Sequence, residues 1–210
     1  MSKFTLDTNC IIDLEENRSD AEYVRKLVQA WKAGRIELAV VAVSASENQK
    51  GGAANRNFSP FEERLRKVGL AGVQHLLPLA KWDVFYWDHA LWSDDEMISL
   101  ESKIRGILFP GIQVSPPEDI ESNSSWRNQL CDILVAWSHA FHKWDYLVTR
   151  DKNFHAHKDE LKRVGIKEVV YPKDAVRICS FWGVNIEKIR QGLSKALFAC
   201  RRLLRCTNRV

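Results

Sequence analysis

A short apolar run at the N-terminus ends in a carboxylate and constrains the fold more than any other stretch of this chain. Residues Lys3–Leu6 are followed by Asp7, and an amide, Asn9, comes two residues later, before further apolar residues. Strands of parallel sheets read as near-continuous hydrophobic runs, and ligands bind just beyond their carboxyl ends. We therefore predict a first parallel strand over Lys3–Leu6, with Asp7 at its exit and a turn or helix beginning at Asn9.

Asp7 by itself is better explained as a helix cap, because Asp and Asn are favoured at that position. Its interpretation depends on whether other carboxylates occupy equivalent places. The next segment, 17–33, has helical spacing, begins with a capping box of Ser19 and Glu22, and ends at Gly34. The β-rich apolar run Ile36–Val43 follows, which predicts a right-handed βαβ unit.

Residues from Ser44 are expected to open a further helix that places Glu47 at the same sheet edge as Asp7. The rest of the chain continues to alternate between strand and helix patterns. Gly- and Asn-rich residues 51–57 and Pro-, Ser- and acid-rich residues 114–125 are predicted loops. Predicted helices cover 59–72, 93–107, 126–142, 154–164 and 172–182, and predicted strands cover 82–87, 145–149 and 167–171.

Acidic side chains recur at the ends of these predicted strands. Glu47 follows the second strand, Asp151 follows the strand at 145–149, and Asp132 lies early in the preceding helix. In a parallel sheet these positions converge with Asp7 on the carboxyl edge, where like charges need a counter-charge. Mg²⁺ or Mn²⁺ takes such oxygen ligands and supports hydrolysis of a phosphodiester. The sequence therefore predicts a metal site at this edge.

The sequence gives less support to a nucleophilic catalytic site, a phosphate-binding loop or a cysteine-based metal site. The chain shows no Ser/His/Asp or Cys/His arrangement and no Gly-rich phosphate loop, and its five cysteines are widely spaced without a CxxC pair. We interpret Cys10 and Cys131 as buried fillers, and His139 and His142 as ordinary packing residues.

The longest apolar runs are too short to span a bilayer, and no secretory signal is evident. These features favour a cytoplasmic protein with reduced thiols.

Four segments in a fixed order resemble the signature of PIN-domain ribonucleases, including VapC-type toxins. They are Leu6–Asn9, Glu47, Cys131–Ala136 and Asp145–Phe154, and Tyr171–Ala175 also looks similar. The resemblance covers roughly 3–51 and 127–182. It implies an α/β/α sandwich with a central, mostly parallel sheet and metal-dependent cleavage of RNA.

Carried over by position, the resemblance makes Asp7, Glu47, Asp132 and Asp151 the catalytic and metal-binding acids. Asn9 and Thr149 become supporting polar groups that orient acids or water. Arg150 and Lys152, which flank the last acid, are candidates for nucleic-acid contact. Small PIN toxins are shorter than this chain, so 52–126 is interpreted as an insertion within a nuclease domain of 1–182.

Residues 183–210 form a basic tail with an apolar stripe at helical spacing. They carry seven Lys or Arg against one Glu, a net of +6, which leaves −2 for the rest of a chain whose total is +4. A helix docked on the domain, an RNA-binding arm, a partner-binding helix and an interfacial membrane helix are the alternatives. Arg201, Arg202 and Arg205 are the tail's candidates for RNA contact.

The favoured function is a Mg²⁺- or Mn²⁺-dependent endoribonuclease, with the toxin of a toxin–antitoxin pair as its more specific form. RNA is then the substrate, with an antitoxin protein and a second copy of the chain as candidate partners. One alternative is a PIN-like module that binds RNA or protein without cutting. A haloacid-dehalogenase-like phosphatase is another, but it requires a second Asp where this chain has Asn9.

Overall fold

All strands of the central sheet run parallel, which confirms the predicted fold class. The structure is a computed structural model and describes residues 1–45, 58–80, 89–113 and 124–179. Within these residues five strands form one sheet in the order β3-β2-β1-β4-β5, so β1 is central. The strands are β1 Lys3–Leu6, β2 Glu37–Val41, β3 Gln74–Leu76, β4 Tyr146–Val148 and β5 Glu168–Val170.

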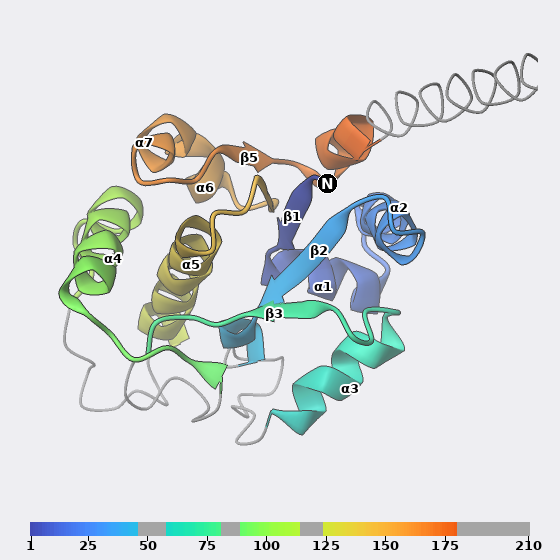
Figure 1. The fold of residues 1–210 in the computed structure, drawn as a ribbon, viewed down its shortest axis with the longest axis horizontal. Coiled ribbons are helices and arrows are strands. Elements are labelled where there is room, and N and C mark those ends of the chain that lie inside the picture. Colours follow the sequence, from blue (N-terminus) through green and yellow to red (C-terminus); the bar gives the residue numbers. More distant parts are fainter. Residues whose placement is uncertain (46–57, 81–88, 114–123, 180–210) are drawn as a thin grey trace, which may run out of the picture.

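Helices cover both faces of the sheet. On one side lie α1 to α3, and on the other α4 to α7 (Figure 1). The helices are α1 Thr8–Glu16, α2 Ala21–Lys32, α3 Ser59–Lys67, α4 Asp95–Leu108, α5 Ser124–Phe141, α6 Lys152–Ala156 and α7 Lys158–Arg163, with a 3₁₀ turn at Ala42–Ala45 and a further helical stretch at 172–179. The predicted three-layer α/β/α sandwich is therefore confirmed.

Alternating side chains of β2 fill two separate cores. Leu38 and Val40 join the core beneath α1, α2 and α3, whereas Ala39 and Val41 join the core beneath α5. A strand with both faces buried needs apolar residues at every position, which explains the continuous run in the sequence. Cys10 and Cys131 are buried in these cores, as predicted.

The ends of several elements differ from the predictions. Helix α2 begins after Asp20 rather than at the capping box of Ser19, and Asp94, not Ser93, caps α4 by accepting a hydrogen bond from the Met97 N–H (2.8 Å). Gly34 does end α2 as expected, because its φ of +65° suits glycine. Strand β2 stops at Val41, and the predicted helix from Ser44 is a 3₁₀ turn as far as it is described.

Two larger corrections concern missing or divided elements. Strand β3 was not predicted, because its three residues include only one buried apolar side chain, Leu76. The helix predicted over 154–164 is two short helices that meet at His157. The predicted strand 82–87, most of the loop 114–125, the loop 51–57 and the tail lie outside the described residues. No described helix has the length and apolar character needed to cross a bilayer.

Histidine 139 on α5 is a buried polar residue of the core. Its Nδ1 lies 2.9 Å from the Thr5 hydroxyl of β1, and within the described structure its Nε2 has no hydrogen-bond partner. Burial lowers the pKa of His139 to about 3; the negative charge of Asp145 opposes this shift, and the positive charge of Lys167 adds to it. The residue is thus a packing histidine, as predicted, and it is neutral in the folded protein near pH 7.

We expect acid to destabilise the fold through His139. A histidine that protonates at pH 6.5 when unfolded but only near 3 when folded favours the unfolded chain as the pH falls through this range. The variant His139→Phe cannot titrate at this position. Its unfolding free energy minus that of wild type should therefore be about 2 kcal/mol larger at pH 5 than at pH 7.5. Urea denaturation of both proteins at each pH measures this difference. A difference that does not change with pH would contradict it.

Candidate functional site: a buried carboxylate cluster

The side chain of Asp7 is held where β1 ends and α1 begins. The Asp7 N–H continues the sheet by donating to the Val148 carbonyl (3.0 Å), and its Oδ1 caps α1 by accepting from the Thr8 N–H (2.7 Å). The capping interpretation is therefore correct. Its Oδ2 accepts two further bonds, from Asn9 Nδ2 (2.5 Å) and Thr149 Oγ1 (2.6 Å). Asp7 is only 3% exposed, so the capped carboxylate is also buried.

Asn9 and Thr149 join the ends of β1 and β4 around this carboxylate. Besides binding Asp7, the two side chains contact each other (Asn9 Nδ2 to Thr149 Oγ1, 2.8 Å). Asn9 Oδ1 accepts from the Arg150 N–H (3.2 Å), and Thr149 Oγ1 accepts from the Asp151 N–H (2.9 Å). The structure thus brings together Asp7, Asn9, Thr149 and Asp151, which were selected from distant parts of the sequence.

Burial raises the pKa of Asp7 to about 6. The hydroxyl of Thr149 and the Thr8 N–H oppose this rise by binding the ionised form, the negative charge of Asp151 adds to it, and Arg150 opposes it. The like charges considered in the sequence therefore contribute, but loss of water contributes more. Near pH 7 the fold maintains an ionised carboxylate against its desolvation.

Asp151 is half-buried and is the second acid of the cluster. It caps α6, with its Oδ1 accepting from the Asn153 N–H (2.7 Å). Asn153 in turn donates through Nδ2 to the Leu108 carbonyl of α4 (3.0 Å). The short helix α6 thereby fixes Asp151 between the sheet edge and the α4 side of the molecule.

The described part of the structure does not place the other two predicted acids, Asp132 and Glu47, in this hydrogen-bonded cluster. Asp132 is half-buried in the middle of α5, not early in it, because α5 begins at Ser124. Glu47 lies outside the described residues, as do Arg201, Arg202 and Arg205. Among the described residues, no three His, Cys, Asp or Glu side chains form a group that could hold a metal ion.

The donor chemistry still suits a hard divalent cation. Asp7 and Asp151 are carboxylates that interact electrostatically, and Asp7 remains buried at an energetic cost that a cation would offset. In the described part of the chain the cluster therefore offers two of the four predicted acids.

Arg150 folds back onto α1. Its Nε lies 2.7 Å from Asp13 Oδ2 and 3.9 Å from Asp20 Oδ2. Asp13 is fully buried, and burial raises its pKa while Arg150 opposes the rise. The pair is held by charge and not by a well-aligned hydrogen bond, since neither Arg150 Nε nor the Asp13 oxygens have an aligned partner in the described structure.

This pairing was not predicted from the sequence. A signal was present, because Asp13 interrupts the apolar residues Ile11, Ile12 and Leu14 within a helix that had to be largely buried. The proposed nucleic-acid contact of Arg150 stays a prediction; its side chain is 29% exposed, and its guanidinium is already paired with Asp13. Lys152, the first residue of α6, is exposed.

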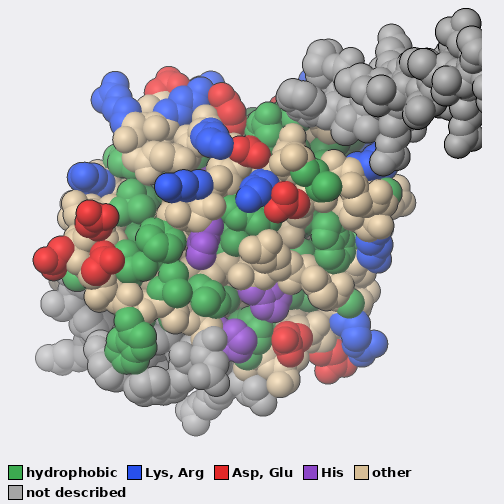
Figure 2. Space-filling view, viewed as in Figure 1, with side chains coloured by type: hydrophobic (Ala, Val, Ile, Leu, Met, Phe, Trp, Pro, Cys, Tyr) green, Lys and Arg blue, Asp and Glu red, His purple; other side chains and the backbone are tan. Residues whose placement is uncertain are grey.

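The surface beyond β5 carries both signs of charge. In Figure 2, Lys and Arg side chains at the α6–α7 end are interspersed with Asp and Glu. The sequence of α7, Lys158–Arg163, has the same mixture. Any nucleic-acid contact at this end would therefore depend on particular side chains and not on a uniformly basic face.

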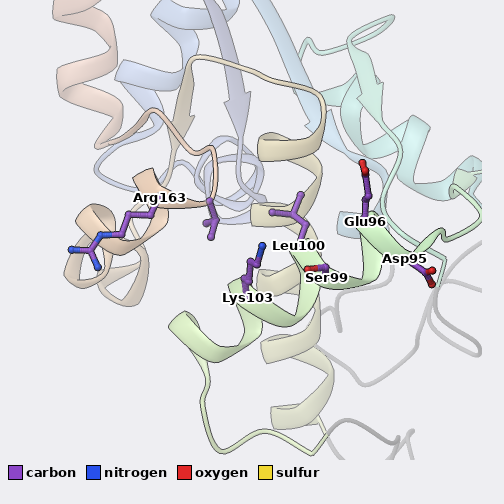
Figure 3. Close-up of a pocket in the computed structure, with 7 residues that line it drawn as sticks. Asp95, Glu96, Ser99, Leu100, Lys103 and Arg163 are labelled. Atoms are coloured by element: carbon purple, nitrogen blue, oxygen red, sulfur yellow. The ribbon is translucent and has the colours of Figure 1, made fainter.

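A hollow of about 520 Å³ lies between α4 and the end of α7 (Figure 3). Its lining combines acids of the first turn of α4, Asp95 and Glu96, with Lys103 and Arg163. Asp7, Asp132 and Asp151, the predicted acids that the structure describes, do not line it, so the hollow is separate from the carboxylate cluster.

Comparisons with known proteins give a distant structural likeness. No protein-family model and no curated protein matches the chain. One similar solved structure is VapBC2 from Rickettsia felis bound to a DNA fragment from its promoter, with 13% identity, a TM-score of 0.42, and coverage of 80% of this chain and 98% of that chain. Another is FitAB bound to the IR36 DNA fragment, with 15% identity, a TM-score of 0.38, and coverage of 80% and 94%.

Proposed function

We propose that this protein is a metal-dependent endoribonuclease that hydrolyses phosphodiester bonds in RNA. The observation that carries the proposal is the buried carboxylate of Asp7, which three donors hold at the carboxyl edge of the sheet beside the charge of Asp151. Helix capping alone does not require this arrangement, because a solvent-exposed Asp caps a helix without the cost of burial. A cation bound beside Asp7 and Asp151 would offset the cost of keeping a buried carboxylate ionised, which supports the proposal.

Asp7, Glu47, Asp132 and Asp151 are the residues proposed to hold the cation. When bound, Mg²⁺ or Mn²⁺ supplies positive charge that polarises the phosphate and eases deprotonation of the attacking water. The Thr149 hydroxyl and the Asn9 amide fix the orientation of the Asp7 carboxylate, as supporting groups around metal ligands do. Asp151, half-buried beside them, is the acid of the pair that solvent and substrate reach more easily.

The proposal is tested by incubating the purified chain with mixed cellular RNA and with single-stranded DNA. We expect cleavage of RNA in Mg²⁺ or Mn²⁺ and loss of cleavage in excess EDTA, because the carboxylates alone cannot neutralise the phosphate. Calorimetric titration with Mn²⁺ should give binding to the wild-type chain. Equal cleavage with and without EDTA would contradict the metal requirement, and metal-independent RNA binding without cleavage would favour the non-catalytic module.

The more specific part of the proposal is that the nuclease is the toxin of a toxin–antitoxin pair. Under this proposal, induced expression of the chain slows growth through loss of RNA, and an antitoxin protein prevents it by covering the carboxylate edge. Growth measurements with and without a small DNA-binding protein encoded beside the gene test this. Growth that is unaffected while RNA cleavage persists in vitro would separate the nuclease from a toxin role.

A further inference from the structure

Tyr171 presents an aromatic ring at the same edge of the sheet. It directly follows β5 and is 43% exposed. Its ring stacks on the imidazole of His155 in α6, with centroids 3.6 Å apart and planes 11° from parallel. Single exposed aromatic residues are common on protein surfaces and need no explanation. Tyr171 differs because a second ring already supports one of its faces.

The position of this ring pair is fixed by Thr149, the residue that also binds Asp7. The Thr149 N–H donates to the Val170 carbonyl (3.1 Å), directly before Tyr171. The Thr149 carbonyl lies 3.0 Å from His155 Nε2, and its hydroxyl donates to Asp7 Oδ2 (2.6 Å). One residue therefore connects the exposed ring pair to the carboxylate cluster. Figure 1 shows α6 beside β5 at this end of the fold.

The backbone of Tyr171 is also well anchored. Its carbonyl accepts from the N–H groups of Asp174 and Ala175 (3.0 Å each), so the residue forms the start of the helical stretch 172–179. With the backbone fixed and one ring face supported, little freedom is left for the ring to lose when a planar ligand packs against it. Such preorganisation lowers the entropic cost of binding.

We propose that Tyr171, supported by His155, is a stacking platform for an unpaired nucleobase next to the phosphodiester that the carboxylate cluster cleaves. This inference rests on the proposed function. Unpaired bases stack on exposed aromatic rings, and this interaction tolerates any base because each has a π-face. The platform would therefore hold a single-stranded substrate in register with the carboxylates without fixing a sequence.

The test measures binding of a fluorescent RNA decamer in EDTA, where cleavage is not expected. Tyr171→Ala should weaken RNA binding about 5- to 100-fold, because the loss of one base–aromatic stack lowers affinity by a factor in this range. Tyr171→Phe, which keeps the ring, should bind within about 2-fold of wild type. Tyr171→Leu keeps a large apolar side chain but has no π-face. It should therefore fold and bind RNA about as weakly as Tyr171→Ala does.

A matched control uses Phe141, the last residue of α5. It is 36% exposed and stacks on Trp137 (centroids 4.6 Å apart, planes 12° from parallel), but it precedes β4 and so lies toward the amino edge of the sheet. Phe141→Ala should leave RNA affinity unchanged. If it weakens binding as much as Tyr171→Ala, the effect is general and the proposal fails.

Abasic substitutions distinguish stacking from structural support. A series of decamers with one base removed at successive positions should reveal a position where wild type loses affinity and Tyr171→Ala loses none. RNA and DNA versions of the series report whether the ribose matters. If wild type cleaves RNA while Tyr171→Ala binds every oligonucleotide as wild type does, the stacking proposal alone is overturned. If wild type neither binds nor cleaves RNA, the proposed function fails as well.

Discussion

Replacing Asp7 by asparagine is expected to lower the rate of RNA cleavage by at least about 100-fold, because even residues that only support a metal ligand cost up to this much when mutated. The amide removes the charge that the cation requires but keeps the size of the side chain and one oxygen acceptor. Single-turnover cleavage in saturating Mg²⁺ measures the effect. Manganese calorimetry on the same variant should show weakened binding.

The Asp7→Asn variant should remain folded. Burial raises the pKa of Asp7 to about 6, so near pH 7 the ionised side chain carries an unfavourable desolvation energy that the amide does not. The amide NH2 cannot accept one of the hydrogen bonds that the carboxylate accepts, and this loss offsets the gain from desolvation. We therefore expect the thermal midpoint of the variant, measured without metal, to stay close to that of wild type.

Asp145→Asn is a suitable control for this experiment. Asp145 precedes β4 at the opposite edge of the sheet, where it accepts from the Lys3 N–H (3.0 Å) and from Lys167 Nζ (2.6 Å). The same chemical change there should leave cleavage unchanged. If the Asp7→Asn variant cleaves RNA at the wild-type rate, the carboxylate cluster has no part in the mechanism and helix capping is the role of Asp7.

Arg150→Ala is expected to reduce the free energy of unfolding by about 3 kcal/mol, as leaving a buried carboxylate without its partner does. The alanine leaves the fully buried Asp13 carboxylate without the cation that lies 2.7 Å from it. The variant loses less than an uncompensated charge would cost, because Asp13, whose pKa burial already raises, can take up a proton. For a domain of this size the thermal midpoint should fall by about 6 to 12 °C.

A double-mutant cycle separates the pair from other effects of the arginine. Asp13→Asn removes the buried charge, so adding Arg150→Ala to it should cost much less than in the wild-type background. Urea denaturation of the four proteins gives the coupling energy. If Arg150→Ala costs the same with and without the Asp13 charge, the ion pair does not stabilise this loop, and Arg150 becomes a stronger candidate for RNA contact.

The sequence predicted four of the five described strands, because strands buried on both faces are largely apolar. The run Ile36–Val43 and the exit of β1 at Asp7 were recognisable for that reason, and the order of the strands then fixed which residues share an edge. The supporting roles of Asn9 and Thr149 were assigned only through the resemblance to a family pattern. Their contacts with Asp7 depend on the pairing of β1 with β4, which local periodicity does not report.

What the sequence could not predict depends on tertiary contacts. The ion pair of buried Asp13 and half-buried Arg150 joins the first helix to a loop late in the chain, and neither residue indicates the other in the sequence. Strand β3 is too short to have a period of its own. Tyr171 looks like an ordinary strand residue until its ring is found on His155.

The central position of β1 also affects how the protein is made. Its pairing with β4 joins segments about 140 residues apart, and the bond from Thr149 to Asp7 spans 142 positions. Contacts this distant form late, since closing the intervening loop costs entropy before any contact compensates for it. A nascent chain that has not yet released β4 from the ribosome therefore cannot assemble the Asp7–Thr149 cluster. Under the proposed function, each new molecule becomes able to cut RNA only after most of its chain has been synthesised and folded.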